Sequence, residues 1–396
     1  MASASLQAVE AIGQELALVY SSPDLDITIT NGVILSLFCM GSSFCWADPQ
    51  RLGTQFLCEV RRLLGHLQDR YDALTTSTPR LFDFFRGCLK YEEMLHHVAG
   101  DKKAQSSPPP VSFNVLEPIS TSPHPWTGVS PEILSLFGES ISLCRKECAR
   151  RQQPNSMTQK SLQKALHAIN EAKMLEETLL AIAPLSLQPK FDEFVSLERW
   201  LHLRDTTEAY RLSSLLQLYQ TFPDLIAWRM PSQVGPDGIV PHNLWLSPLA
   251  LHLLNLLRRI PPTSDLRCIQ PLLYLSAGSC LRNDVVATPS FSIDEPLDET
   301  SSILPDFMTE HTSSEFVGQS TEVPSITLEA LNIGSARKLV VDRLCQLEQV
   351  LPAKPIGVAK SLMAVTWETY DNEILEAKKT HWLDIMASTG LQTLFG

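Results

Sequence analysis

The chain has 396 residues, of which 44% are hydrophobic and 19% are charged, enough apolar material for one large core or two smaller ones. Its 44 acidic and 32 basic residues give a formal net charge of −12. Contacts from lysine and arginine to phosphate supply much of the affinity of a typical DNA-binding protein. The acidic balance therefore disfavours direct, unaided DNA binding, although a local basic patch is still compatible with it.

The first twenty residues lack a cationic start and contain two glutamates, so they do not have the pattern of a signal peptide. No run approaches the roughly 18 apolar residues that span a bilayer, and we expect no membrane association. The nine cysteines include no Cys-x-x-Cys pair, which argues against a disulfide framework and a thiolate zinc site. Cys144 and Cys148 stand four residues apart, as a metal clamp would, but they continue an apolar stripe and are expected to pack in the core.

Apolar residues spaced by three and four predict helices in the N-terminal part of the chain, residues 1–99. The expected helices are residues 5–20, 51–68 and 79–98, and the apolar run at residues 33–40 is expected to belong to a buried helix. Residues 100–125 lack this spacing and are rich in proline and serine, which is typical of an exposed connector.

Helical spacing returns in the central part, residues 126–281. Ser130, Pro131 and Glu132 form a clear helix start, because serine caps free N–H groups, proline fits the first turn and glutamate complements the helix dipole. The expected helices are residues 130–151, 162–182, 197–220, 244–259 and 265–281.

Residues 282–325 are acidic and rich in serine, threonine and proline. From residue 281 to residue 330 there are ten acidic residues and a single basic one, Arg282. Such a composition buries too little apolar surface to offset the entropy of ordering, so we predict a disordered segment. The C-terminal part, residues 326–396, is expected to add helices at 327–350 and 359–389. The predicted fold is all-α, an array of antiparallel helical pairs with Pro/Ser-rich and acidic disordered connectors.

Two polar clusters could carry chemistry, and for each a structural role is favoured. The helix at 130–151 ends in Arg145, Lys146, Arg150 and Arg151. We interpret these as cations placed at a helix C-terminus rather than as a nucleic-acid patch. The helix at 79–98 ends in Glu92, Glu93, His96 and His97. A dimetal site would need a second such motif on a facing helix, and the sequence has none, so we interpret the cluster as a solvated helix end.

Sequence motifs for catalysis are not found. There is no phosphate-cradling Gly-x-x-x-x-Gly-Lys loop, no Gly-x-Gly-x-x-Gly, no Gly-x-Ser-x-Gly and no His-Glu-x-x-His. His124 lies between prolines, which favours a fixed turn over a proton shuttle. We therefore expect a protein that is not an enzyme, and predict no catalytic residue, no metal ligand, no cofactor-binding residue and no cofactor.

Several segments, taken in order, resemble the fungal-specific transcription factor regulatory domain. They are residues 81–98 (LFDFFRGCLKYEEMLHHV), 124–151, 208–225 (EAYRLSSLLQLYQTFPDL), 248–281, and the tryptophans Trp367 and Trp382 near the C-terminus. The resemblance covers most of residues 30–395 and keeps its order throughout. It implies an all-α domain, nuclear localisation and control of a gene set, and many relatives govern secondary-metabolite clusters.

The common plan of that family places a binuclear zinc-cluster DNA-binding motif upstream of the helical domain. The six-cysteine motif and its basic flank are missing from this sequence, so zinc-binding and base-reading roles transfer to none of its residues. Some regulators of secondary-metabolite clusters stand alone in this way. We expect such a regulator to reach DNA indirectly, through other transcription factors or coactivators; an upstream coding segment missing from the sequence is the rival explanation.

The acidic segment offers a means of contacting partners. The apolar residues expected to bind a coactivator groove are Phe291, Ile293, Leu297, Phe307 and Met308. Acidic neighbours keep such side chains accessible to a partner on which the segment can fold. An inert surface loop is the alternative interpretation of this segment. For the whole chain, the alternatives are a helical protein-interaction scaffold and a metabolite sensor. A homo- or hetero-oligomer is compatible with the regulator and with both alternatives.

Overall fold

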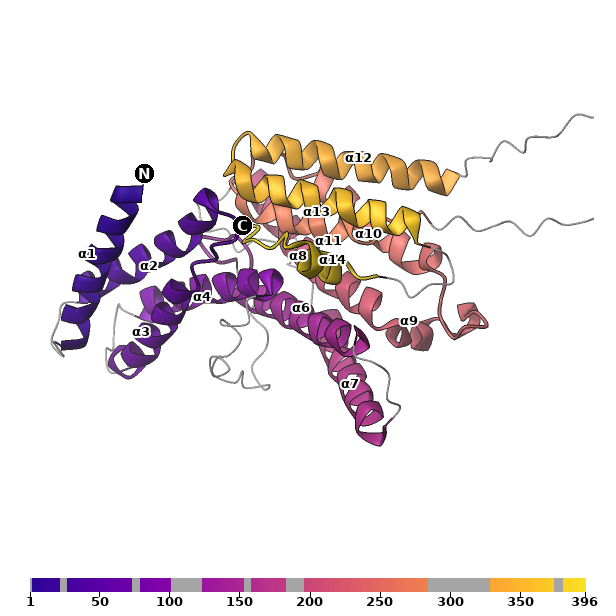
Figure 1. Cartoon of the computed structure of the whole chain (residues 1–396), viewed down its shortest axis with the longest axis horizontal. Coiled ribbons are helices and arrows are strands. Elements are labelled where there is room, and N and C mark those ends of the chain that lie inside the picture. Colours follow the sequence, from indigo (N-terminus) through magenta and orange to yellow (C-terminus); the bar gives the residue numbers. More distant parts are fainter. Residues whose placement is uncertain are drawn as a thin grey trace, which may run out of the picture.

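The computed structural model describes residues 2–21, 27–72, 79–100, 123–152, 158–182, 196–283, 328–373 and 380–396. All regular structure in these ranges is helical, which confirms the predicted fold class (Figure 1). In chain order the helices are α1 (Ala2–Ser21), α2 (Ile27–Ala47), α3 (Thr54–Asp72), α4 (Pro79–Ala99), α6 (Pro131–Gln152), α7 (Gln159–Ala181), α8 (Leu197–Thr221), α9 (Pro223–Arg229), α10 (His242–Arg258), α11 (Gln270–Gly278), α12 (Leu328–Glu348), α13 (Ala353–Asn372) and α14 (Trp382–Thr389), with short 3₁₀ turns at Pro231–Gln233 and Arg267–Ile269.

Three of the helices begin at a serine or threonine whose hydroxyl caps the first turn. Helix α6 begins at Pro131, and the Oγ of Ser130 accepts the backbone N–H of Glu132 at 3.2 Å, as the sequence predicts. Thr158 and Ser196 cap α7 and α8 in the same manner, by accepting a backbone N–H three residues on. An N-cap of this kind satisfies one of the donors that a helix start leaves free.

A row of parallel helices, α4, α6, α8 and α11, forms the centre of the molecule. Helices α4 and α6 run in the same direction, because contacts join early residues of both and late residues of both. Lys90 pairs with Glu132 at 3.0 Å, and the Arg145 guanidinium donates to the Val98 carbonyl at 2.5 Å. The same holds for α6 and α8, from the ring pair Phe137–Tyr210 to the contact between Arg151 and the Thr221 carbonyl. Gly138 allows α4 and α6 to approach closely, because an added Cβ would lie 3.2 Å from the Met94 Cα.

Antiparallel pairs, which we predicted, are also present. In α12 and α13, Glu348 pairs with Lys360 while Arg337 pairs with Asp371, so the two helices run in opposite directions. Helices α8 and α10 are also antiparallel, with Tyr219 against Trp245 and Asp205 against Arg259. The parallel packing of α4, α6, α8 and α11 is a feature that the sequence pattern did not reveal, because it depends on contacts between residues far apart in the chain.

Two clusters of buried side chains fill the molecule, and α4 contributes to both. The smaller cluster joins α1, α2 and α3 to the first half of α4, through Phe82, Phe85 and Cys88. The larger one joins the second half of α4, through Met94 and Val98, to the remaining helices.

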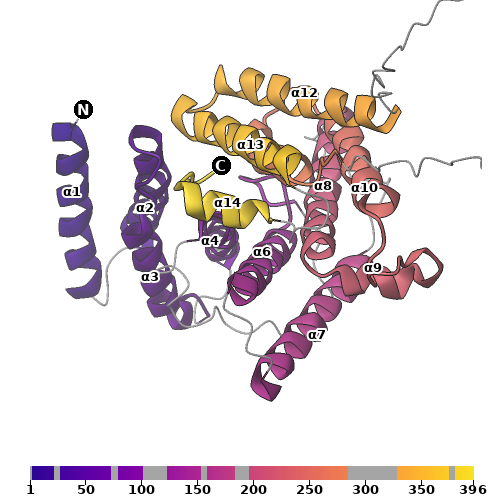
Figure 2. The same ribbon diagram turned by 45° about the vertical axis from the view of Figure 1, so that its right-hand side comes forward.

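The last three helices cover the row. Gly278 of α11 lies beneath Met363 and Trp367 of α13, and α14 packs against α6 and α13. Figure 2 shows α14 lying between α13 and the helices α4 and α6. The predicted single helix at 359–389 is therefore wrong in its bounds: α13 ends at Asn372, and α14 starts only at Trp382 with His381 as its N-cap. The apolar run at 33–40 belongs to a helix as predicted, the longer α2.

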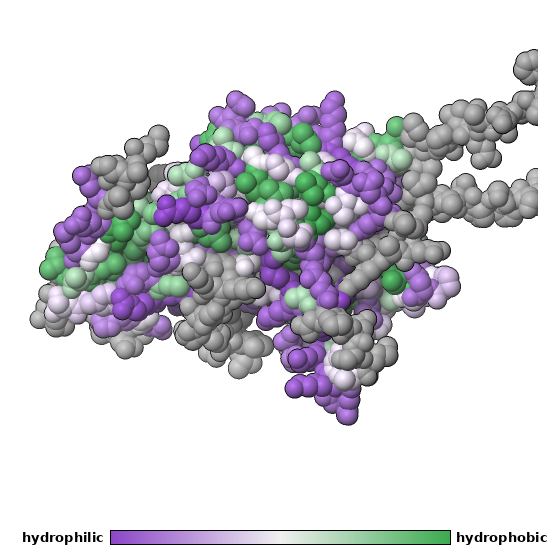
Figure 3. Space-filling model, viewed as in Figure 1, coloured by the Kyte–Doolittle hydropathy of each residue, from purple (hydrophilic) through white to green (hydrophobic). Residues whose placement is uncertain are grey.

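The surface is mixed in polarity. In Figure 3, hydrophilic residues cover the protruding end of α7, while apolar residues gather over α1 and α2 and over α13. Among the described residues, no helix is both long enough and apolar enough to cross a membrane.

Candidate functional site: the C-terminal end of helix α11

The predicted partner-binding residues Phe291, Ile293, Leu297, Phe307 and Met308 lie outside the described residues. They stay a prediction. The structure does describe the residues directly before their segment, at the end of α11, and the residues directly after it, at the start of α12. We therefore take the end of α11 as the candidate site.

Side chains from three other helices bind the last carbonyl groups of α11 and of the turn after it. The donors and acceptors are Trp367 Nε1 to Gly278 O at 2.9 Å, Gln220 Nε2 to Ser279 O at 2.9 Å, Tyr370 Oη to Ser279 O at 3.1 Å, and Arg337 Nη2 to Leu281 O at 2.8 Å. The final carbonyls of an α-helix have no N–H partner within the helix and carry partial negative charge. Donors from α8, α12 and α13 satisfy these carbonyls, and thereby fix the point at which the chain leaves α11.

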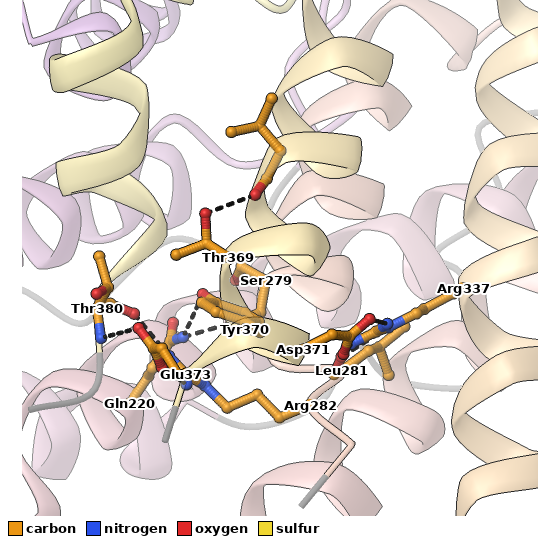
Figure 4. A network of polar contacts seen from close by, with 11 residues as sticks. Gln220, Ser279, Leu281, Arg282, Arg337, Thr369, Tyr370, Asp371, Glu373 and Thr380 are labelled. Carbon is orange, nitrogen blue, oxygen red and sulfur yellow. Dashed lines mark hydrogen bonds and ion pairs between the residues drawn. The ribbon is translucent and has the colours of Figure 1, made fainter. Parts of the chain in front are cut away.

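Arg282, the next residue, forms a buried clamp (Figure 4). Its Nη1 pairs with Glu373 Oε2 and its Nη2 donates to the Thr380 carbonyl, both at 2.6 Å. Its guanidinium also lies 3.6 Å from the centre of the Tyr370 ring, a cation–π contact. The Thr380 backbone N–H donates to the other oxygen of Glu373 at 2.7 Å. Arg282, at the start of the acidic segment, thus binds Glu373 at the end of α13 and Thr380 just before α14.

The electrostatics of the clamp favour its charged form. Burial alone would raise the pKa of Glu373, but the hydrogen bonds from Thr380 and Arg282 outweigh it, so the pKa is lowered. Arg337 repeats the arrangement at the edge of the site, where its guanidinium pairs with Asp371 at 2.6 Å. Two arginines and two carboxylates therefore join α11, α12 and α13.

A second polar centre lies deeper, around Gln217 of α8, which is fully buried. Its Nε2 donates to the hydroxyls of Ser276 at 3.0 Å and Ser279 at 3.2 Å. Its Oε1 accepts the indole N–H of Trp382 at 2.6 Å. One amide thus connects α8, α11 and α14, with both of its ends satisfied, as a buried polar group requires.

His381 belongs to the same region but is not suited to proton transfer. Its Nδ1 accepts the Leu383 backbone N–H at 3.2 Å, and its Nε2 lies 3.3 Å from the Thr221 hydroxyl. Burial lowers the pKa of His381 to about 3, and the neighbouring cations Arg151 and Arg282 add to the effect. The imidazole is therefore neutral near pH 7 and acts as a helix cap.

The predicted solvated helix end at Glu92, Glu93, His96 and His97 is wrong. Glu92, Glu93 and His96 are buried, because α2 and α3 cover them. The Ser42 hydroxyl donates to Glu92 at 2.7 Å, and Arg61 pairs with Glu93 at 2.6 Å. The two carboxylates thus bind different neighbouring helices. Within the described ranges, no group of three or more side chains is placed to hold a metal ion.

Two other sequence interpretations can be compared with the structure. Cys144 and Cys148 are buried in the core as predicted, and burial raises the pKa of the Cys144 thiol to about 12. All nine cysteines are free. The His124 imidazole lies in a fixed turn, where its Nε2 donates to the Phe84 carbonyl at 2.9 Å and its Nδ1 accepts the Trp126 N–H.

Three of the four cations at the basic end of α6 bind partners within the protein, while Lys146 is exposed. Arg150 and Arg151 both pair with Glu147, at 2.6 and 2.8 Å. Arg145 donates to the Val98 carbonyl, the end of the neighbouring α4. The prediction of a structural role is confirmed for these three arginines, although their partners are Glu147 and carbonyls of other helices rather than the end of α6 itself.

Sequence reasoning missed the residues that build this site. Gln217, Arg282 and Arg337 bind partners between 34 and 165 residues away. One local signal was available, since Arg282 is the single basic residue in a long acidic stretch. Arg282 therefore marks the place where the central helical part ends and the acidic segment begins.

Comparison with known proteins shows the family to which the chain belongs. A family described as the fungal specific transcription factor domain matches residues 1–290, most of the chain. No curated protein and no solved structure shows a significant match. Helices α12 and α13 lie beyond the matched range, yet they supply three of the side chains that bind the end of α11, Arg337, Trp367 and Tyr370. The chain belongs to the fungal specific transcription factor domain family and is, by that membership, a regulator of transcription.

Proposed function

We propose that this protein is a non-enzymatic transcription regulator that acts in the nucleus and reaches DNA through protein partners. The family supports regulation of transcription, and the charge of the chain supports indirect DNA access. With a net charge of −12, long-range electrostatics oppose the approach of a phosphate backbone.

The observation that carries this proposal is that the three arginines at the end of α6 are bound within the protein. The sequence offers one obvious basic cluster, and its arginines are occupied by Glu147 and by backbone carbonyls. Arginines engaged in this way have few donors left for phosphate. A non-enzymatic role is supported by the buried thiols and histidine, whose shifted pKa values make them poor nucleophiles and bases near pH 7.

For the target genes, we propose a secondary-metabolite biosynthesis cluster. The support is the resemblance of the chain to the helical domain of regulators that govern such clusters. For the mode of action, we propose that the acidic segment is captured by a coactivator through Phe291, Ile293, Leu297, Phe307 and Met308. The clamp around Arg282 supports this, because a fixed exit point would keep the segment at a constant place on the surface.

Deleting residues 285–323 from the full chain should abolish reporter activation. The reason is that the deletion removes the apolar anchors but leaves the Arg282 clamp in place. Replacing the five anchors with serine should have the same effect, while deleting part of the other connector, residues 102–121, should leave activation intact. Unchanged activation by both the 285–323 deletion and the serine variant would refute the activation role.

A further inference from the structure

Helices α10 and α12 lie side by side and run parallel, with few direct contacts between them. Near their N-terminal ends, Asn243 Nδ2 donates to Glu329 Oε2 at 3.5 Å. Near their C-terminal ends, Arg343 Nη2 approaches the Arg258 carbonyl at 3.5 Å. At 1.5 Å per helical residue, the two contacts are about 22 Å apart. We call the line between them the α10–α12 seam.

The N-terminal end of the seam is a groove of about 340 Å³, whose lining includes the polar residues Asn243, Ser247, Glu329 and Asn332. Pro248 and Leu251 line it from α10, and Leu328 and Ile333 line it from α12. Leu328 is 75% exposed, and Leu244, one turn before Pro248, is 43% exposed. Isolated exposed leucines are ordinary, but a hollow bordered by exposed leucines on a soluble surface is a feature of docking sites.

Pro248 lies in the α10 wall of this groove. Because proline has no N–H, the carbonyl of Leu244 lacks the donor that it would have in a regular helix. With both apolar and polar side chains in its lining, the groove has the mixed composition of a recognition site.

The C-terminal end of the seam is cationic. Arg258 is exposed, and its side-chain partner is the amide of Asn255; the side-chain partner of Arg343 is the amide of Gln346. In the part of the chain that the structure describes, neither arginine meets a carboxylate. The adjacent Arg259 is exposed and bonds Asp205 at 3.0 Å. Arg204 bonds the same Asp205 at 2.8 Å, so that one carboxylate serves two arginines.

A buried hydroxyl lies close to this end. The Tyr274 side chain is 1% exposed, and its hydroxyl has no hydrogen-bond partner among the described residues. Burial raises the pKa of Tyr274 to about 12, and the charge of Arg343 opposes the rise. Arg258 and Arg343 thus form a basic surface on a chain whose net charge is −12.

We propose that the α10–α12 seam binds an acidic amphipathic helix of a protein partner. Its apolar side chains would occupy the groove, and its carboxylates would pair with Arg258 and Arg343, which present forked donors suited to carboxylates. This rests on the proposed function, because it describes the partner through which the protein acts. A helix rather than a DNA backbone fits the seam, since a phosphate backbone has no side chain for the groove.

Binding of a fluorescein-labelled helical peptide of about 15 residues to the full chain tests this, since such a helix spans the seam. The probe has leucines at helical spacing in one half and glutamates in the other. We expect the double variant Arg258→Gln/Arg343→Gln, and separately Leu328→Asp, to weaken binding about tenfold or more. The control Arg62→Gln, a 64% exposed arginine of α3, should leave affinity unchanged. Thermal melts of each variant establish that the fold is kept.

Three results would overturn the inference. The double variant could bind the peptide as tightly as the unmodified chain. Duplex DNA could bind more tightly than the peptide and be lost in the double variant, which would make the seam a nucleic-acid surface. Deletion of residues 285–323 could raise peptide affinity, which would show that the chain itself fills the seam. If reporter activation still requires residues 285–323 while the double variant binds normally, the inference fails and the proposed function stands.

Discussion

Replacing Trp382 with alanine should destabilise the whole protein by about 3–5 kcal/mol, the usual cost of truncating a large buried aromatic side chain. The Trp382 side chain is fully buried, and its indole N–H donates to Gln217 Oε1 at 2.6 Å. The variant loses the packing and leaves the buried amide oxygen of Gln217 without its donor, which adds to the cost. Urea unfolding of the full chain, followed by circular dichroism at the helical band, measures this change.

The matched control is Trp228→Ala. Trp228 is 55% exposed and makes a cation–π contact with Lys173, so its loss should cost about 1 kcal/mol or less. If the two variants were equally stable, α14 would not be part of the cooperative core. The comparison therefore shows whether helices beyond residue 290 belong to the same folding unit as the part that matches the family.

Replacing Glu373 with alanine should cost about 3 kcal/mol or more, because it leaves the buried Arg282 charge without its carboxylate. The Arg282 side chain is 7% exposed and that of Glu373 is 15% exposed, so little water can take the place of the lost partner. The double variant Arg282→Met/Glu373→Leu should recover much of the loss, since it removes both charges. A double-mutant cycle in urea unfolding measures the coupling between the two positions.

A surface pair provides the control for this cycle. Glu171→Gln breaks the contact with His167. The side chains of Glu171 and His167 are 48% and 76% exposed, so the substitution should change the free energy of unfolding by about 0.5 kcal/mol or less. Equal effects for Glu373→Ala and Glu171→Gln would contradict the view that the clamp fixes the exit of the acidic segment. A large effect at Glu373 with no recovery in the double variant would assign the loss to packing instead of charge.

The features that sequence predicts here are those that depend on neighbours along the chain. The start of α6 at Pro131 is correct, because capping by Ser130 and the fixed φ of proline act within one turn. The spacing of apolar residues along α6 correctly places Cys144 and Cys148 in the core for the same local reason.

The features that sequence does not predict depend on contacts across the fold. Glu92 and Glu93 look like a solvated helix end because their own neighbours are polar, and only α2 and α3 supply Ser42 and Arg61 to them. The candidate site is a stronger case. Its acceptors are backbone carbonyls at the end of α11, which are the same for any sequence, so nothing in their residue types points to the side chains that bind them.

The central claim is that this protein is found on chromatin through its partners. Chromatin immunoprecipitation of the tagged full chain, before and after depletion of candidate partner transcription factors, tests it most directly. We predict enrichment at the promoters of a metabolite biosynthesis cluster that disappears when the partner is depleted. Enrichment that persists without any partner, matched by sequence-selective binding of the purified chain to the same promoters at about 0.15 M salt, where distant surface charges are screened, would contradict the claim.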